Sequence, residues 1–285
     1  MFVPPQEKIP VHFAPKVDAA MMLYAHHPNE QSPVFVCLPA MGVSSKHYAH
    51  LAHLLANELN GIAITTDWRG LGTSSIRAKR GIDFGYKELL EDLNHQLGIV
   101  KSKYPDRRIY LIGHSLGGQL ACLYSAWGKV NVNGIILVAA CSIYYKGWPG
   151  IEGYKILAFT QFSRLLSKVL GYFPGKKVGF GGTESQTVIE DWSYTCRTGR
   201  YELKNMDFNF EQALAKVDMP VLAVHIANDQ LSPPLAIENL CAKLTSAAVT
   251  KTTIGNSQHT HKLNHFNWVK HPETLLTEIK RWFGD

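Results

Sequence analysis

A serine lies between two glycines in residues 113–117, Gly-His-Ser-Leu-Gly. The run before it, 109–112, is apolar and rich in β-branched residues, which is typical of a buried strand. Leucines with helical spacing follow it. Strand, Gly-x-Ser-x-Gly and helix in this order predict a sharp turn that raises the Ser115 hydroxyl above the sheet edge as a nucleophile. A plain strand-to-helix turn with a surface serine could use the same glycines, but the flanking elements favour the nucleophile.

Gly113 and Gly117 have a steric purpose in such a turn. Side chains at these two positions would collide with the neighbouring strand and helix. The predicted helix also points its free N–H groups toward Ser115, where negative charge develops during acyl transfer. The segment therefore favours acyl transfer through a serine ester.

A serine hydroxyl attacks efficiently only when a base removes its proton and a third group holds that base. Asp229 is the best-placed carboxylate, because it follows the apolar run 219–226 in a short polar turn. His265, between a polar loop and the last predicted helix, is the expected base. The chain order Ser115, Asp229, His265 is one that serine triads use. Asp218 precedes the same apolar run and would lie at the wrong end of the sheet.

Two N–H donors are needed to hold the oxyanion of a tetrahedral intermediate. The backbone of Leu116, next to the nucleophile, is expected to supply one. The loop after the predicted strand that ends at Leu38 is expected to supply the other. Met41 is the first choice there, because Gly42 beside it allows a tight backbone path.

These motifs make the chain resemble the α/β-hydrolases over nearly its whole length. The motifs that carry the resemblance are residues 67–74, 113–118, 227–229 and 265–266. The resemblance implies the α/β-hydrolase fold, an inserted cap or lid, and hydrolysis by a Ser/His/Asp triad.

The chain is particularly similar to bacterial predicted serine hydrolases of esterase type that have no assigned substrate. They share the loop Pro-Ala-Met-Gly at 39–42 and an insertion that resembles 173–182, Phe-Pro-Gly-Lys-Lys-Val-Gly-Phe-Gly-Gly. Many α/β-hydrolases carry His-Gly where this chain has Pro39 and Ala40. The second oxyanion donor is therefore open between Ala40 and Met41.

Apolar runs alternate with helical patterns along most of the chain. Strands are expected at 18–26, 33–38, 61–66, 109–112, 132–140, 219–226 and 247–254, and helices at 45–59, 86–103, from 116 onward, at 234–244 and at 272–283. This alternation predicts an α/β protein with a mostly parallel central sheet flanked by helices. Residues 1–141 and 213–285 are expected to form this core.

Residues 142–212 interrupt the alternation and are rich in glycine and aromatic residues. The segment begins just after a predicted strand, and loops at the carboxyl ends of strands line the ligand crevice in α/β sheets. It is therefore predicted to form a cap over a pocket. The alternative is a peripheral subdomain whose aromatic side chains make only its own core.

Composition sets limits on the partners of this chain of 285 residues, of which 46% are hydrophobic and 18% charged. That profile is typical of an ordinary globular enzyme. The formal net charge of +6 is spread over small clusters, so a nucleic-acid partner is not expected. The longest apolar runs are too short to cross a bilayer, so no integral membrane segment is expected.

Five scattered cysteines form no C-x-x-C pair. Together with an N-terminus that lacks a signal-peptide pattern, they predict reduced core residues in a cytoplasmic protein. No motif indicates a nucleotide or metal cofactor, so none is expected. Homo-oligomerisation is left open.

The expected function is that of a serine hydrolase with an acyl-enzyme intermediate. The aromatic insertion favours a small-molecule carboxylic ester with a hydrophobic acyl or aryl group. A thioesterase, an amidase or peptidase, and a carbon–carbon hydrolase could use the same triad. A catalytically silent small-molecule binding module could keep the pocket without the chemistry.

Overall fold

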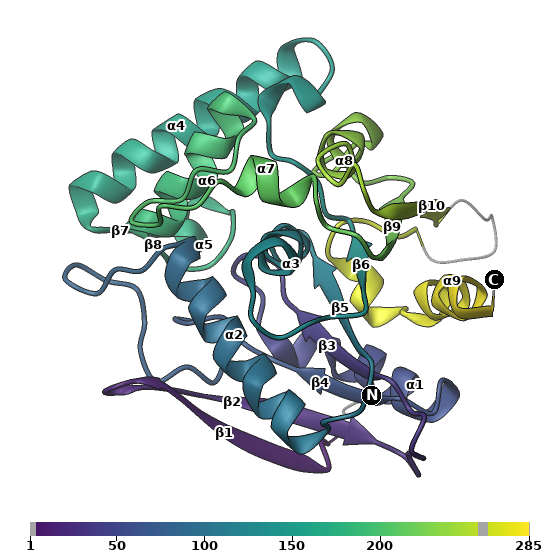
Figure 1. The fold of residues 1–285 in the computed structure, drawn as a ribbon. Coiled ribbons are helices and arrows are strands. Elements are labelled where there is room, and N and C mark those ends of the chain that lie inside the picture. The colour runs from purple at the N-terminus through teal and green to yellow at the C-terminus, as the bar shows by residue number, and fades with distance from the viewer. Residues whose placement is uncertain (1–3, 256–261, 285) are drawn as a thin grey trace.

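The computed structural model describes residues 4–255 and 262–284. Within them, an eight-stranded sheet has the order β1-β2-β4-β3-β5-β6-β9-β10 (Figure 1). All neighbouring pairs from β4 to β10 are parallel, and β1 and β2 form an antiparallel edge. The mostly parallel sheet predicted from the sequence is confirmed. The strands are β1 (Glu7–Ala14), β2 (Val17–Ala25), β3 (Val34–Leu38), β4 (Ile62–Thr65), β5 (Ile109–His114), β6 (Gly134–Val138), β9 (Pro220–Ile226) and β10 (Ala248–Ile254).

Helices cover both faces of the sheet. α2 (Tyr86–Lys103), α3 (Leu116–Trp127) and α8 (Pro234–Cys241) pack on one face (Figure 1). α1 (Ala49–Glu58) and α9 (Glu273–Gly284) pack on the other. Short 3-10 turns precede these last two helices, η1 (Ser45–Tyr48) and η3 (Asn267–Lys270).

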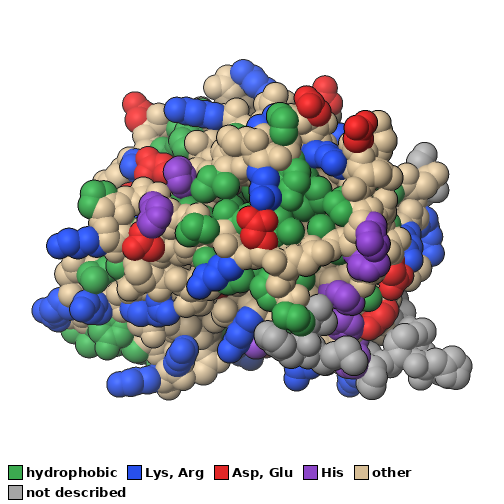
Figure 2. Space-filling model, turned by 90° about the horizontal axis from the view of Figure 1, so that it is seen from below, with side chains coloured by type: hydrophobic (Ala, Val, Ile, Leu, Met, Phe, Trp, Pro, Cys, Tyr) green, Lys and Arg blue, Asp and Glu red, His purple; other side chains and the backbone are tan. Residues whose placement is uncertain are grey.

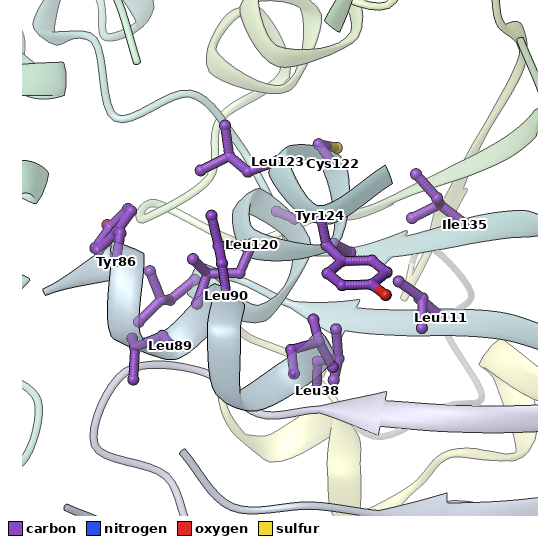
Figure 3. Close-up of a cluster of buried hydrophobic side chains, with 14 of the residues drawn as sticks. Leu38, Tyr86, Leu89, Leu90, Leu111, Leu120, Cys122, Leu123, Tyr124 and Ile135 are labelled. Atoms are coloured by element: carbon purple, nitrogen blue, oxygen red, sulfur yellow. The ribbon is translucent and has the colours of Figure 1, made fainter. Parts of the chain in front are cut away.

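Strand side chains alternate between two buried layers. On β5, Leu111 joins the core beneath α2 and α3, whereas Tyr110 and Ile112 join the core beneath α1 and α9. Because both faces are covered, the strand is apolar at every position rather than at every second one. Figure 3 shows part of the first layer, in which Tyr124 of α3 lies between the leucines of α2 and α3 and Leu111 of the sheet.

The parallel strands bring the predicted site residues to one edge. β3 ends before the loop that contains Met41, β5 before Ser115, and β9 before Asp229. Carboxyl ends of parallel strands lie at the same edge, where α/β sheets bind their ligands. The sheet topology thus accounts for how residues more than a hundred positions apart become neighbours.

The segment between β6 and β9 holds more regular structure than the sequence analysis expected. Its main elements are α4 (Ile151–Leu170) and α6 (Gln186–Thr198), which pack on each other. Gly171 and Gly199 end these helices in the left-handed region, with φ of 81° and 73°, a common helix stop. The remaining elements are η2 (Tyr145–Gly147), α5 (Gly175–Val178), the antiparallel ribbon β7 (Tyr172–Phe173) and β8 (Glu184–Ser185), and α7 (Phe210–Leu214).

The predicted boundary of the insertion at residue 212 falls inside α7. This short helix packs on α3. α7 therefore packs with the core, whereas α4 and α6 lie above the carboxyl ends of the strands (Figure 1).

The first strand, β1, is absent from the sequence analysis. Ile9 and Val11 alternate with exposed residues, as in a half-buried strand, but Pro10 between them argues against a strand. β1 is the edge of the sheet and pairs only with β2. A proline is tolerated there, because no neighbour needs its missing N–H.

No helix among residues 4–255 and 262–284 is long and apolar enough to cross a membrane.

Glu184, on β8, is a buried carboxyl with one hydrogen-bond donor. The backbone N–H of Gly182 donates to Glu184 Oε1 at 3.0 Å, and the residue is 5% exposed. Burial raises the pKa of Glu184 from 4.5 to about 7, because the charged form loses hydration. The folded protein therefore keeps this proton at pH values where the unfolded chain has lost it.

Glu184→Gln should remove a pH-dependent loss of stability. Between the ordinary pKa and the raised one, the folded state binds more protons than the unfolded state, so the free energy of unfolding falls as pH rises. From about pH 5 to about pH 8, the free energy of unfolding of wild type should fall by about 2 to 3 kcal/mol more than that of Glu184→Gln. Urea denaturation at both pH values measures this difference. Glu30→Gln, at an exposed position, is the control and should follow wild type at both pH values. If the free energy of unfolding of Glu184→Gln fell with pH as much as that of wild type, the prediction would be wrong.

Candidate active site

Ser115 occupies the turn between β5 and α3. Its backbone has φ of 52° and ψ of −115°, a conformation that non-glycine residues rarely adopt. The Ser115 N–H donates to Val138 O of β6 at 3.1 Å, and its carbonyl accepts from Gly118 and Gln119 of α3 at 3.0 and 3.2 Å. Neighbouring elements thus hold a strained backbone in place, as is common at functional sites.

The flanking glycines are required by close backbone contacts. A Cβ at Gly113 would lie 2.4 Å from Gly118 Cα, and one at Gly117 would lie 2.2 Å from Leu38 O. Neither contact can be relieved by rotating a side chain. The first turn of α3 therefore packs directly on β5 and on the end of β3, as the sequence analysis expected for this turn.

Asp229 and His265 form a buried pair. Asp229 Oδ2 lies 2.7 Å from His265 Nδ1, and the side chain of each is at most 8% exposed. The other carboxylate oxygen, Oδ1, accepts from the N–H groups of Leu231 and Ser232 at 2.8 and 3.2 Å. Because the carboxylate is only an acceptor, Nδ1 carries the proton and Nε2 is left as the basic nitrogen.

One cavity brings the serine and the histidine together. Ser115 and His265 line it with Leu116, Ala40 and Met41, and its volume is about 170 Å³. Ser115 is half-buried and so accessible from this cavity. No hydrogen bond joins its hydroxyl to His265 among the described residues, and such bonds often tighten only when substrate binds.

The loop after β3 has one N–H already used and one free. The Ala40 N–H donates to the hydroxyl of Tyr48 at 3.0 Å. Trp68 Nε1 donates to Pro39 O at 2.7 Å, which fixes the loop from the other side. The N–H groups of Met41 and Leu116 have no partner within the described chain. Of the two donors left open by the sequence, the geometry favours Met41.

A buried network supports this loop, and the sequence analysis missed two of its members. Trp268 Nε1 donates to His114 Nε2 at 3.3 Å, and His114 Nδ1 lies 2.7 Å from the Tyr48 hydroxyl. Burial, and then the neighbouring His265, hold the pKa of His114 well below its usual value. His114 is therefore neutral, and it connects the turn at Ser115 to the Ala40 loop and to the segment after His265. Tyr48 and Trp268 have no local motif that could have identified them.

Aromatic side chains from the insertion line the same cavity. Phe180 and Trp192 stack with their ring centroids 5.4 Å apart, and Phe159 meets Phe180 edge-on at 5.2 Å. Trp148 closes the wall on the side of the Asp229 turn, where its Nε1 donates to Gln230 O at 3.1 Å. The cavity is therefore mostly apolar around the reactive groups.

The glycine-rich segment 173–182 lies directly on the Met41 loop. A Cβ at Gly42, where φ is 72°, would be 2.1 Å from Gly182 N. Gly181 approaches the side chain of Met41 and lines the cavity beside it. The motif singled out in the sequence thus holds the backbone that carries an expected oxyanion donor.

Within residues 4–255 and 262–284, no three His, Cys, Asp or Glu side chains are grouped so that they could hold a metal ion. The chemistry that this arrangement supports is nucleophilic attack by Ser115, with His265 as general base.

Comparisons with known proteins agree with this geometry. Residues 29–263 match the family model described as "Serine aminopeptidase, S33". Monoglyceride lipase from Mus musculus is 24% identical over 241 residues, which cover 82% of this chain and 77% of the lipase.

Solved esterases share the fold. Esterase RhEst1 from Rhodococcus sp. ECU1013 has a TM-score of 0.57 at 20% identity, and 99% of each chain is covered. Est1E from Butyrivibrio proteoclasticus, solved with ferulic acid, has a TM-score of 0.61 at 16% identity, with 92% of this chain and 94% of that chain covered. At such identities the likeness establishes the fold.

Gly117→Ala should destabilise the protein, and Gly98→Ala should stabilise it. The first substitution forces α3 away from Leu38 and Pro39 at the end of β3 and should cost about 3 kcal/mol. At Gly98, inside α2, a Cβ would meet no atom within 4 Å, so the better helix propensity of alanine should add about 1 kcal/mol. Urea denaturation of the two variants measures both effects. If Gly117→Ala left the free energy of unfolding unchanged, the turn at Ser115 would have space for a Cβ at this position.

Asp229→Asn should lower kcat for an activated ester by about 10⁴-fold, because the amide favours the wrong tautomer of His265. Asp218→Asn, at an exposed position before β9, is the matched control and should turn over like wild type. Steady-state kinetics of both variants tests this. Near-normal kcat in Asp229→Asn would mean that another carboxylate orients the histidine.

Proposed function

The chain belongs to the S33 serine aminopeptidase family of α/β-hydrolases, and from this premise we propose that it is a serine carboxylesterase. As a member of this family, it is a hydrolase. The observation that carries the proposal is a single apolar cavity that contains both the strained serine and a histidine bound to a buried aspartate.

The proposed reaction has two steps. Nε2 of His265 takes the proton of Ser115 Oγ as this oxygen attacks the ester carbonyl. The N–H groups of Met41 and Leu116 hold the resulting oxyanion, and Asp229 stabilises the imidazolium. The intermediate expels the alkoxide, which receives the proton from His265. Water, deprotonated by the same nitrogen, then releases the acid and restores Ser115.

The proposed substrate is a small ester with a hydrophobic acyl or aryl group. Phe159, Phe180 and Trp192 supply much of the wall, and an apolar group gains free energy by leaving water for such a wall. Residues 142–212 are proposed to act as the cap, because α4, α6 and the segment between them contribute these side chains. Monoglyceride lipase, a relative named for an ester substrate, also supports an oxygen ester.

Although the family model is described as an aminopeptidase, no contact in the described site favours a thioester, an amide or peptide, or a carbon–carbon bond as the target. A silent binding module would have no chemical need for the strained Ser115 or for the Asp229–His265 pair. On the face shown in Figure 2, lysines and arginines lie among acidic and histidine side chains in the upper part and with few acidic neighbours at the lower left. A nucleic acid is not proposed as a partner, because the sequence holds no long basic run with interleaved aromatic residues.

A cytoplasmic location is also proposed. All five cysteines are free and buried, and burial raises the pKa of the Cys37 thiol to about 12. Free cysteines fit a reducing compartment.

Fluorophosphonate labelling tests the proposed nucleophile. Wild type should be labelled at Ser115, as mapped by mass spectrometry, and both Ser115→Ala and His265→Ala should lose the label. Ser125→Ala, farther along α3 with its hydroxyl bonded to Ala121 O, should be labelled like wild type. A series of p-nitrophenyl esters of increasing chain length then measures the size of the acyl pocket. A folded wild type that neither labels nor turns over any ester would favour the binding module.

A further inference from the structure

Gln119 contributes an unpartnered polar group to the proposed ester site. It lies on α3, one helical turn after Ser115, and lines the same cavity. The residue is 4% exposed, and its side-chain Oε1 has no hydrogen-bond partner among the described residues. Most of the cavity wall around it is apolar, so the protein does not supply a partner there.

A buried amide oxygen without a partner is unfavourable, because folding removes its hydrogen bonds to water. Other buried side chains with an unpartnered oxygen lie elsewhere: Thr65, Thr66, Tyr86, Gln96, Thr195 and Tyr201. None of these lines the cavity that contains Ser115. Because Gln119 lines the cavity, a bound substrate can supply the partner that its side-chain oxygen lacks, whereas the other six side chains do not line this cavity.

We propose that Gln119 is a specificity-determining residue that binds a hydroxyl group of the substrate. This inference rests on the proposed esterase function and narrows its substrate to hydroxy-substituted esters. Oε1 is an acceptor, so its partner must donate a hydrogen. A hydroxyl can donate this hydrogen to Oε1, whereas a ketone can only accept.

The hydroxyl must lie close to the reacting carbonyl. Four residues of helix separate Ser115 from Gln119, a rise of about 6 Å, and helical side chains lean back toward the N-terminus. The hydroxyl therefore belongs about two to four bonds from the scissile carbonyl carbon. It can belong to the acyl part or to the alcohol part of the ester, and matched substrates separate these two sources.

The test compares each hydroxy ester with its methyl isostere. For the acyl part, the pair is p-nitrophenyl 3-hydroxybutyrate and p-nitrophenyl 3-methylbutyrate, with the 3-oxobutyrate as the acceptor-only control. For the alcohol part, the pair is 2-hydroxypropyl butyrate and isobutyl butyrate. In at least one pair, wild type should favour the hydroxy ester in kcat/KM by about tenfold, as expected for one hydrogen bond to an otherwise unsatisfied amide. The 3-oxo ester should not share that advantage.

Two variants assign this preference to Gln119. Gln119→Met replaces the amide by an apolar side chain of similar size and should abolish or reverse the ratio. Gln96→Met makes the same change on α2, where the Gln96 side-chain oxygen is also buried and unpartnered but lies outside the cavity. Its ratio should equal that of wild type. Equal ratios for wild type and Gln119→Met in both pairs would overturn the proposal.

A binding measurement keeps this result separate from the esterase proposal. Ligand-observed NMR titration of Ser115→Ala with the same ester pairs should show the hydroxy preference, and Ser115→Ala/Gln119→Met should lose it. Hydrolysis without a hydroxy preference would refute the role of Gln119 and leave the esterase intact. A hydroxy preference in binding without hydrolysis or labelling would refute the esterase and retain the binding role of Gln119. Equal binding of each pair by both variants would refute that role.

Discussion

The site depends on the close approach of the first turn of α3 to the ends of β3 and β6. Gly117 lies against Leu38 O, and a Cβ at Gly118 would lie 2.3 Å from the Cβ of Ala140. The Ser115 N–H reaches β6 through Val138 O. These backbone contacts hold the serine in its strained conformation and fix the Met41 loop beside it. The energetic cost of the left-handed residue, about 1 to 3 kcal/mol, is offset by packing that no flexible turn could supply.

The insertion (residues 142–212) packs directly on the loop that carries Met41. The Gly181–Gly182 backbone presses on the Met41–Gly42 backbone, and Phe180 of the same segment stacks on Trp192 of α6. The apolar wall and the proposed oxyanion donor are therefore carried by segments in direct contact. A shift of the insertion would change both the shape of the cavity and the position of the Met41 N–H. In the proposed reaction, the fit of the substrate and the stabilisation of the oxyanion would therefore depend on each other.

The sequence predicted what local patterns encode. Ser115 and Asp229 each follow an apolar strand, and the α/β alternation gave the parallel sheet. Tertiary contacts decided the rest. Tyr48 and Trp268 contact His114 only because η1, η3 and the turn at Ser115 lie together in the fold. The edge strand β1 was not predicted, because it contains Pro10. The choice of Met41 over Ala40 required knowing that the Ala40 N–H is bonded to Tyr48.

The polar groups of the site divide into those with a hydrogen-bond partner in the protein and those without one. Asp229, His114, Tyr48 and the Ala40 N–H all have protein partners. Besides Ser115 Oγ and His265 Nε2, the groups of the described chain that line the cavity without a partner include the Met41 and Leu116 N–H groups and the amide oxygen of Gln119. Two of these are donors suited to a developing oxyanion, and the third is an acceptor that an oxyanion would repel. Under the two proposals, these groups form two distinct polar positions on an apolar wall, one for the reacting carbonyl and one for a hydrogen-bond donor elsewhere on the substrate.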